Sequence, residues 1–143
     1  NYSDGLTDLH LPTFIQHAQE QGKIGNFLCV QPSQSFHLVE MDGNGLVSKI
    51  QDVKQRDIWI NGGYFLFKQD IFRHINFGEE LVYEPFQRLI DQKQLTAYRY
   101  NGFFGVMDTF KEKQMLDDMY SRGETPWEVW RSPQPYRKEA QPV

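Results

Sequence analysis

Two aspartates far apart in the sequence stand where carboxylates could bind a metal ion. Asp4 lies between Ser3 and Gly5, shortly before the first expected helix, and Asp108 lies directly before the strongest expected helix. Carboxylate oxygens are ligands that a hard cation such as Mg²⁺ prefers. The alternative is structural, because an aspartate satisfies backbone N–H groups in a turn or caps a helix. Spacing alone leaves both interpretations open.

A pair of glycines inside an apolar run is the second candidate site. Asn61, Gly62, Gly63 and Tyr64 lie within the run 58–67. The glycines would let a ligand lie against the main chain, and the Asn61 amide offers both a donor and an acceptor. The alternative is a β-bulge with the asparagine in a turn.

Three further polar or reactive residues have simple structural alternatives. Glu84, followed by Pro85, either accepts hydrogen bonds from sugar hydroxyls or places a favourable negative charge at a helix start. Asp8 is expected to be structural, as a cap near the first helix. Cys29 stands in an apolar run and is expected in the core.

Apolar periodicity and turn residues predict how these side chains are positioned. Helices are expected at 12–21, 69–75, 83–91 and 109–122, and strands at 27–30, 36–41, 46–50, 58–67 and 95–100. Thr109 and Glu112 fit a capping box at the last helix, and Gly22 is expected to end the first one. The turn sequence DGNG at 42–45 predicts a hairpin. The expected fold class is therefore α/β, with a mixed sheet flanked by helices.

Composition narrows the class of protein. The 143 residues suit one domain, and a net charge of −4 argues against a broad electrostatic nucleic-acid binder. We expect a cytoplasmic protein, because no apolar run is long enough for a membrane span and the start lacks signal-peptide features. A single cysteine excludes an internal disulfide. Residues 1–131 are the expected domain, and 132–143, rich in proline, a flexible tail.

Five short motifs, taken in order, resemble the C-terminal half of the sugar-1-phosphate nucleotidyltransferases, and most of all their cytidylyltransferases. The motifs are YSDG at 2–5, INGGYF at 60–65, EP at 84–85, MDT at 107–109 and PWEVW at 126–130. The resemblance rests on the order of the whole set rather than on any single motif. The resemblance implies the C-terminal part of a Rossmann-like nucleotidyltransferase fold. Within the last motif, Trp127 and Trp130 are expected to pack from one helix face, and a homo-oligomer is left open.

The resemblance implies an enzyme of nucleotide-sugar biosynthesis, on the way to polysaccharides. A nucleoside triphosphate, here CTP, would react with a sugar 1-phosphate, here glucose 1-phosphate, to give a nucleotide sugar and pyrophosphate. Asp4 and Asp108 match the catalytic, Mg²⁺-binding aspartates. Positions that contact the sugar match Asn61, Gly62 and Glu84, and Gly63 and Tyr64 belong to the same segment.

The chain departs from the family pattern in two places. The family carries a Glu-Lys-Pro segment whose lysine reaches the sugar phosphate, whereas Lys54 is displaced by one position and the proline is absent. A solvated lysine is the alternative for Lys54.

The second departure is that nothing in the chain matches the family's N-terminal glycine-rich nucleotide loop. The expectation is a sugar-acceptor half, inactive alone, whose partner is the N-terminal half. Two alternatives stay open: a non-catalytic sugar-phosphate binding or assembly module, and a structural α/β domain with both aspartates as caps.

Overall fold

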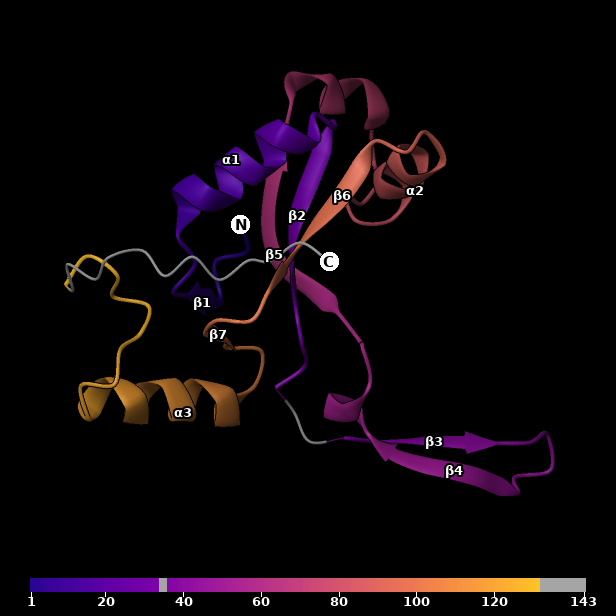
Figure 1. The fold of residues 1–143 in the computed structure, drawn as a ribbon, viewed down its shortest axis with the longest axis vertical. Helices are drawn as coiled ribbons and strands as arrows, with labels where there is room; N and C mark the ends of the chain where they lie inside the picture. The colour runs from indigo at the N-terminus through magenta and orange to yellow at the C-terminus, as the bar shows by residue number, and fades with distance from the viewer. Residues whose placement is uncertain (34–35, 132–143) are drawn as a thin grey trace.

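A three-stranded mixed sheet forms the centre of the molecule (Figure 1). Its middle strand, β2 (Gly25–Val30), runs antiparallel to β5 (Ile60–Phe67) and parallel to β6 (Leu95–Tyr100). The computed structural model describes residues 1–33 and 36–131, and the tail expected at 132–143 lies outside them. The predicted α/β class with a mixed sheet is confirmed.

One helix covers each face of this sheet. Successive side chains of a strand point to opposite faces, so β2 has apolar side chains to bury on both sides. On one face, Phe14 of α1 (Leu11–Gln21) joins Leu28 and Tyr98 in the buried core. On the other, Phe86 of α2 (Glu84–Asp91) packs 5.6 Å, between ring centroids, from Phe27 of β2. Figure 1 shows the two helices on opposite sides of the strands. We call the second side the α2 face.

A second, two-stranded sheet joins two segments that lie far apart in the sequence. It pairs β1 (Gly5–Thr7) with β7 (Phe104–Val106) in antiparallel fashion. Periodicity did not predict these strands, because three residues are too few to show an alternating pattern. The sheet matters because both candidate metal ligands lie directly beside it.

Helix α3 (Phe110–Ser121) follows β7 and begins with the predicted capping box. The Thr109 hydroxyl accepts a hydrogen bond from the Glu112 backbone N–H, and the Glu112 carboxylate accepts one from the Thr109 N–H. The N-cap is therefore Thr109, so the simpler expectation of Asp108 as the cap is wrong.

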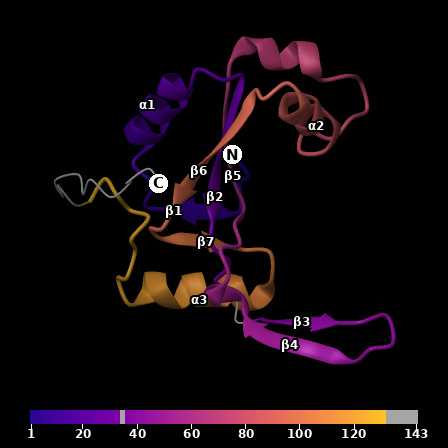
Figure 2. The same cartoon turned by 45° about the vertical axis from the view of Figure 1, so that its right-hand side comes forward.

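The predicted hairpin is formed by β3 (His37–Met41) and β4 (Val47–Asp52). Asp42 stabilises its turn, because Oδ1 accepts hydrogen bonds from the N–H groups of Asn44 and Leu46, each at 2.9 Å. The hairpin extends away from the mixed sheet in both views (Figures 1 and 2). Short 3₁₀ helices, η1 (Val53–Gln55) and η2 (Gln69–His74), follow β4 and β5.

The segment after α3 consists of turns, so the expected helix around Trp127 and Trp130 is wrong. Trp127 nonetheless packs on Phe103, with ring centroids 5.4 Å apart, whereas Trp130 is 73% exposed. None of the helices within residues 1–33 and 36–131 is long and apolar enough to cross a membrane.

Candidate functional site

Pairing of β1 with β7 brings Asp4 and Asp108 together across 104 positions of sequence. Gly5 lies opposite Val106, and the Met107 N–H donates to the Asp4 carbonyl oxygen at 3.0 Å. Asp4 also lies close enough for its charge to act on the Asp108 carboxyl and raise its pKa. The convergence that sequence spacing could not establish is thus present in the structure.

The surroundings of the Asp108 carboxyl disfavour its charged form. Desolvation, the negative charges of Asp4 and Glu112, and the hydrogen bond with Asp4 together raise the pKa of Asp108 above its ordinary value. Like charges held close disfavour ionisation, and a cation between them would reverse that effect. The pair therefore has the donor chemistry of a hard-cation site. Among the described residues, no group of three or more His, Cys, Asp or Glu side chains is placed to hold a metal.

The glycine pair lies in a bulge of β5, which is the structural alternative that the sequence left open. Phe27 pairs with Phe65 and Cys29 with Asn61, so Leu28 alone lies opposite residues 62–64. The Asn61 Oδ1 accepts a hydrogen bond from the Gly63 N–H at 2.8 Å, which stabilises the turn inside the bulge. Asn61 thus has the structural role that the alternative described, and its side chain is also exposed.

Tyr2 packs against this bulge, and sequence reasoning gave it no role beyond its motif. Its N–H donates to the Gly63 carbonyl at 3.0 Å, and its ring lies edge-on to Phe65, with centroids 5.4 Å apart. Gly63 has a φ of +72°, and an added Cβ would lie 2.6 Å from Tyr2 Cδ2. Only a glycine accommodates both the backbone conformation and the tyrosine ring.

Tyr64 connects the same bulge to β1. Its hydroxyl donates to the Gly5 carbonyl at 3.0 Å, and its ring packs against the core. Burial is the main cause that raises the pKa of Tyr64. Tyr2 and Tyr64 therefore hold the segment around Asp4 beside the Asn61–Gly63 bulge, which brings two of the predicted sets into one region.

Asp8 fixes the other end of β1. Its Oδ1 accepts hydrogen bonds from the Tyr100 hydroxyl and, at 2.7 Å, from the Phe103 N–H. Burial and the Asp8 contact raise the pKa of Tyr100 above its ordinary value. Asp8 is structural, as expected, but it does not cap α1, whose N-cap residue is His10.

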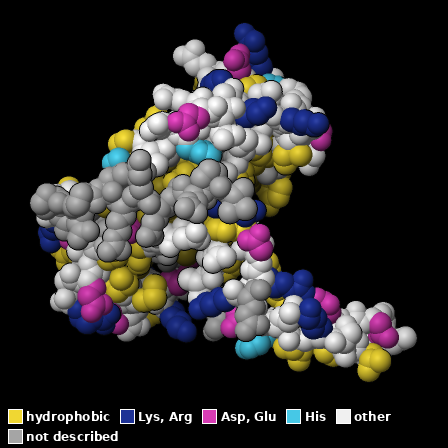
Figure 3. Space-filling model, viewed as in Figure 1, with side chains coloured by type: hydrophobic (Ala, Val, Ile, Leu, Met, Phe, Trp, Pro, Cys, Tyr) yellow, Lys and Arg dark blue, Asp and Glu magenta, His cyan; other side chains and the backbone are white. Residues whose placement is uncertain are grey.

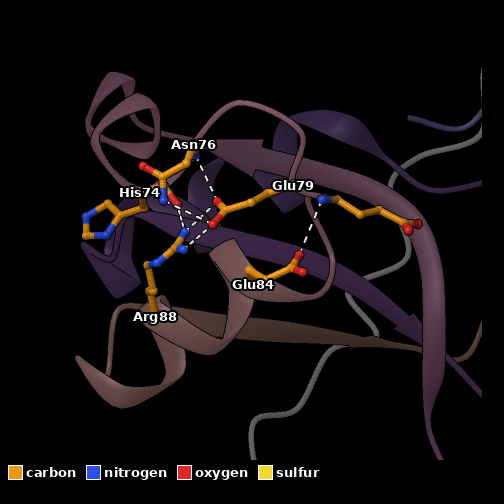
Figure 4. A network of polar contacts seen from close by, with 6 residues as sticks. His74, Asn76, Glu79, Glu84 and Arg88 are labelled. Atoms are coloured by element: carbon orange, nitrogen blue, oxygen red, sulfur yellow. Dashed lines mark hydrogen bonds and ion pairs between the residues drawn. The ribbon is translucent and has the colours of Figure 1, made fainter.

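Lys54 and Glu84 lie at the starts of short helices. Lys54, in η1, donates its backbone N–H to Asp52 Oδ1 at 2.9 Å, and its side chain is exposed. Glu84 begins α2, and its Oε2 accepts a hydrogen bond from the Glu80 N–H at 3.3 Å (Figure 4). Within the described ranges, no hydrogen bond or ion pair joins either residue to Asn61 or to the aspartate pair.

A charged network anchors the loop before α2 (Figure 4). Arg88 donates to Glu79 Oε2 at 2.6 Å and to the His74 carbonyl at 2.7 Å. Asn76 donates its backbone N–H to the Glu79 carboxylate at 2.8 Å. The hydrogen bonds from Arg88 and Asn76 lower the pKa of Glu79 to about 2. The network therefore positions the start of α2, where Glu84 lies.

This pKa shift predicts an acid-dependent loss of stability. A carboxyl whose pKa is lowered by folding stabilises the protein at pH values above the pKa that it has in the unfolded chain. That contribution is lost as the pH falls through the pKa of the folded state. The free energy of unfolding should therefore decrease from about pH 4.5 to about pH 2. Urea denaturation at several pH values would show a shallower decrease for Arg88→Met than for the unmodified chain. An equal decrease of the free energy of unfolding with pH in the two proteins would contradict this role of the Glu79–Arg88 contact.

The chain is similar in sequence to known proteins. The chain is 28% identical over 130 residues to the glucose-1-phosphate cytidylyltransferases of Salmonella typhi and Salmonella typhimurium. Each match covers 90% of this chain and 51% of the relative, so the chain spans about half the length of these relatives. The resemblance to sugar-1-phosphate nucleotidyltransferases is confirmed. No protein-family model matches the chain.

The fold has a solved counterpart. A Bacillus anthracis protein assigned as a glucose-1-phosphate thymidylyltransferase, crystallised with sucrose, matches with a TM-score of 0.55 and 11% identity. The match covers 81% of this chain and 51% of that one. The predicted nucleotidyltransferase-like architecture is thereby confirmed.

Proposed function

We propose that this chain is the sugar-acceptor part of a sugar-1-phosphate nucleotidyltransferase in which Asp4 and Asp108 bind Mg²⁺. The observation that carries this proposal is the convergence of the two carboxylates beside the β1–β7 sheet. Mg²⁺ commonly takes one or two protein carboxylates and completes its coordination with water and substrate phosphates. A site built on the two carboxylates of Asp4 and Asp108 suits that pattern.

In the proposed reaction, a phosphate oxygen of the sugar 1-phosphate attacks the α-phosphorus of a nucleoside triphosphate. The new P–O bond forms as the bond to pyrophosphate breaks, so a nucleotide sugar and pyrophosphate result. Bound Mg²⁺ would neutralise charge on the phosphates and align them. CTP and glucose 1-phosphate are the proposed substrates, supported by the names of the Salmonella relatives.

The chain's own residues would bind and orient the acceptor. Tyr64 fixes β1 through Gly5, and the Met107 N–H fixes the Asp4 backbone, so the two carboxylates are held before substrate arrives. Such preorganisation is a large part of catalysis in phosphoryl transfer. The proposed contacts to sugar hydroxyls and phosphate come from Asn61, Gly62, Gly63, Tyr64, Glu84 and Lys54.

The triphosphate would be bound by an N-terminal part like that of the longer relatives. The relatives are about twice the length that the chain spans, which supports a shared active site. We propose a cytoplasmic enzyme whose nucleotide sugar serves polysaccharide biosynthesis. The same difference in length supports a second candidate function, in which the chain is a sugar-phosphate binding module that does not catalyse transfer.

Adding an N-terminal part from a relative tests the proposal and separates the two candidates. The chain would be fused behind the N-terminal half of the Salmonella typhi relative and assayed with CTP, glucose 1-phosphate and Mg²⁺ for release of pyrophosphate. Turnover by the fusion, and none by the chain alone, is expected. A folded fusion that binds glucose 1-phosphate without turnover would favour the binding module. Turnover by the chain alone would contradict the acceptor-part assignment.

A further inference from the structure

Arg99 lies in the same cross-strand row as Asn61. Arg99 on β6 pairs with Cys29 on β2, and Cys29 pairs with Asn61 on β5. Residues paired across neighbouring strands project from the same face of a sheet. Cys29 is two positions from Phe27, which contacts Phe86, so the row lies on the α2 face. The buried Cys29 thus separates two exposed polar side chains.

The Arg99 guanidinium is directed across β2 toward the start of β5. Its central carbon lies 5.2 Å from the centroid of the Trp59 ring, and Trp59 is two residues before Asn61. The Trp59 indole N–H donates to Asp57, which also lies 3.7 Å from Arg99 Nη2. The positive charge of Arg99 also lowers the pKa of Cys29, against the larger raising effect of burial. The guanidinium is therefore held over the Trp59 ring, two residues before Asn61 in the sequence.

The Arg99 guanidinium has N–H donors that a ligand can use. Its side chain is 63% exposed, and Asp57 is 68% exposed, so their ion pair at 3.7 Å is weak. No hydrogen bond from the Arg99 side chain appears within residues 1–33 and 36–131. Arginine presents five N–H donors in a planar fork that matches a phosphate. Neither the stacking on Trp59 nor the long contact with Asp57 uses that capacity.

The position also suits a ligand. Arg99 lies near the carboxyl ends of the parallel strands β2 and β6, where α/β sheets bind their ligands. In the space-filling view, the outline is indented between the α2 end of the molecule and the β3–β4 hairpin (Figure 3). The start of β5 lies beside this indentation in the ribbon view (Figure 1). A small anion can therefore approach from solvent.

We propose that Arg99 binds the phosphate of the sugar 1-phosphate whose hydroxyls contact Asn61. This inference rests on the proposed function and adds to it the residue that recognises the phosphate. It also accounts for the displaced lysine, since a guanidinium positioned in the same cross-strand row as Asn61 supplies the charge that Lys54 was expected to provide. Asp57 opposes the phosphate charge and limits its affinity.

Binding of glucose 1-phosphate, with glucose as the uncharged control, tests this role by titration and amide NMR shifts. Arg99→Gln should weaken glucose 1-phosphate binding about tenfold or more, as expected for a lost charge-assisted hydrogen bond. Glucose binding should be unchanged, Arg99→Lys should recover part of the loss, and Asp57→Asn should tighten phosphate binding. Arg73→Gln is the matched control, because Arg73 is also exposed and paired with a nearby aspartate.

The outcomes separate this inference from the proposed function. The role of Arg99 would be overturned if Arg99→Gln weakened the binding of glucose 1-phosphate and of glucose equally. It would also be overturned if Arg99→Gln bound glucose 1-phosphate as tightly as the unmodified chain does. Neither result would contradict the proposed function. A tenfold loss in Lys54→Met with none in Arg99→Gln would return the phosphate to the lysine. If the unmodified chain binds neither ligand, the sugar-acceptor function and this inference both fail.

Discussion

Replacing Asp108 by asparagine is expected to weaken divalent-cation binding by more than about 100-fold. Loss of a partner that merely orients a metal ligand already costs about 10- to 100-fold in affinity, and loss of a ligand itself should exceed that. Mn²⁺ is a suitable probe, because its unpaired electrons broaden nearby amide signals. The broadening should centre on residues 4–5 and 106–108 and disappear in Asp4→Asn and in Asp108→Asn.

The pKa of Asp108 gives a readout that does not depend on the metal. Asp4→Asn removes the neighbouring negative charge, so the pKa of Asp108 should fall toward its ordinary value. Part of the elevation should remain, because desolvation is its largest cause. Carbon-13 titration of the side-chain carboxyls would measure the change.

Asp70→Asn is the matched control for the Mn²⁺ experiment. Asp70 is exposed and pairs with Arg73, 3.2 Å away in η2, so its replacement should leave Mn²⁺ broadening around residue 108 unchanged. If both aspartate variants retained the affinity of the unmodified chain, the carboxylates would have a structural role only. The remaining candidate would then be the α/β domain without a metal site.

Local sequence chemistry predicted the elements whose stability is local. The capping box at Thr109, the Asp42 turn and the glycine that ends α1 each depend on residues within a few positions. Gly22, for example, ends α1 with a φ of +67°, which glycine adopts without strain. Such features can be predicted from a sequence because their partners lie next to them.

The candidate site depends on contacts that no local pattern encodes. Asp4 meets Asp108 only because two three-residue strands pair, and those strands are too short to show periodicity. Tyr2 meets Gly63 across 61 positions, and Arg99 is aligned with Asn61 by the register of three strands. The ordered motifs predicted which aspartates to compare, but only the strand pairing shows that they meet.

Gly63→Ala should destabilise the chain and disturb the aspartate pair together. A non-glycine residue held at a φ of +72° costs about 1 to 3 kcal/mol. The new Cβ would also lie 2.6 Å from Tyr2 Cδ2, so the ring must move. Because Tyr2 is two residues from Asp4, the displacement should reach the carboxylates. Urea denaturation would measure the loss of stability, and the Asp108 carboxyl signal would report the change at the site.

Two glycines of the hairpin turn separate the causes of this effect. Gly45 has a φ of +84° with nothing within 4 Å of an added Cβ, so Gly45→Ala measures the backbone strain without a clash. Gly43→Ala has open space and no positive φ, and it should be nearly neutral. In the double variant Tyr2→Ala/Gly63→Ala the clash is absent. Relative to Tyr2→Ala, the alanine at position 63 should then lower the free energy of unfolding by about as much as Gly45→Ala does. An unchanged Asp108 signal in Gly63→Ala would show that the bulge does not position the aspartate pair.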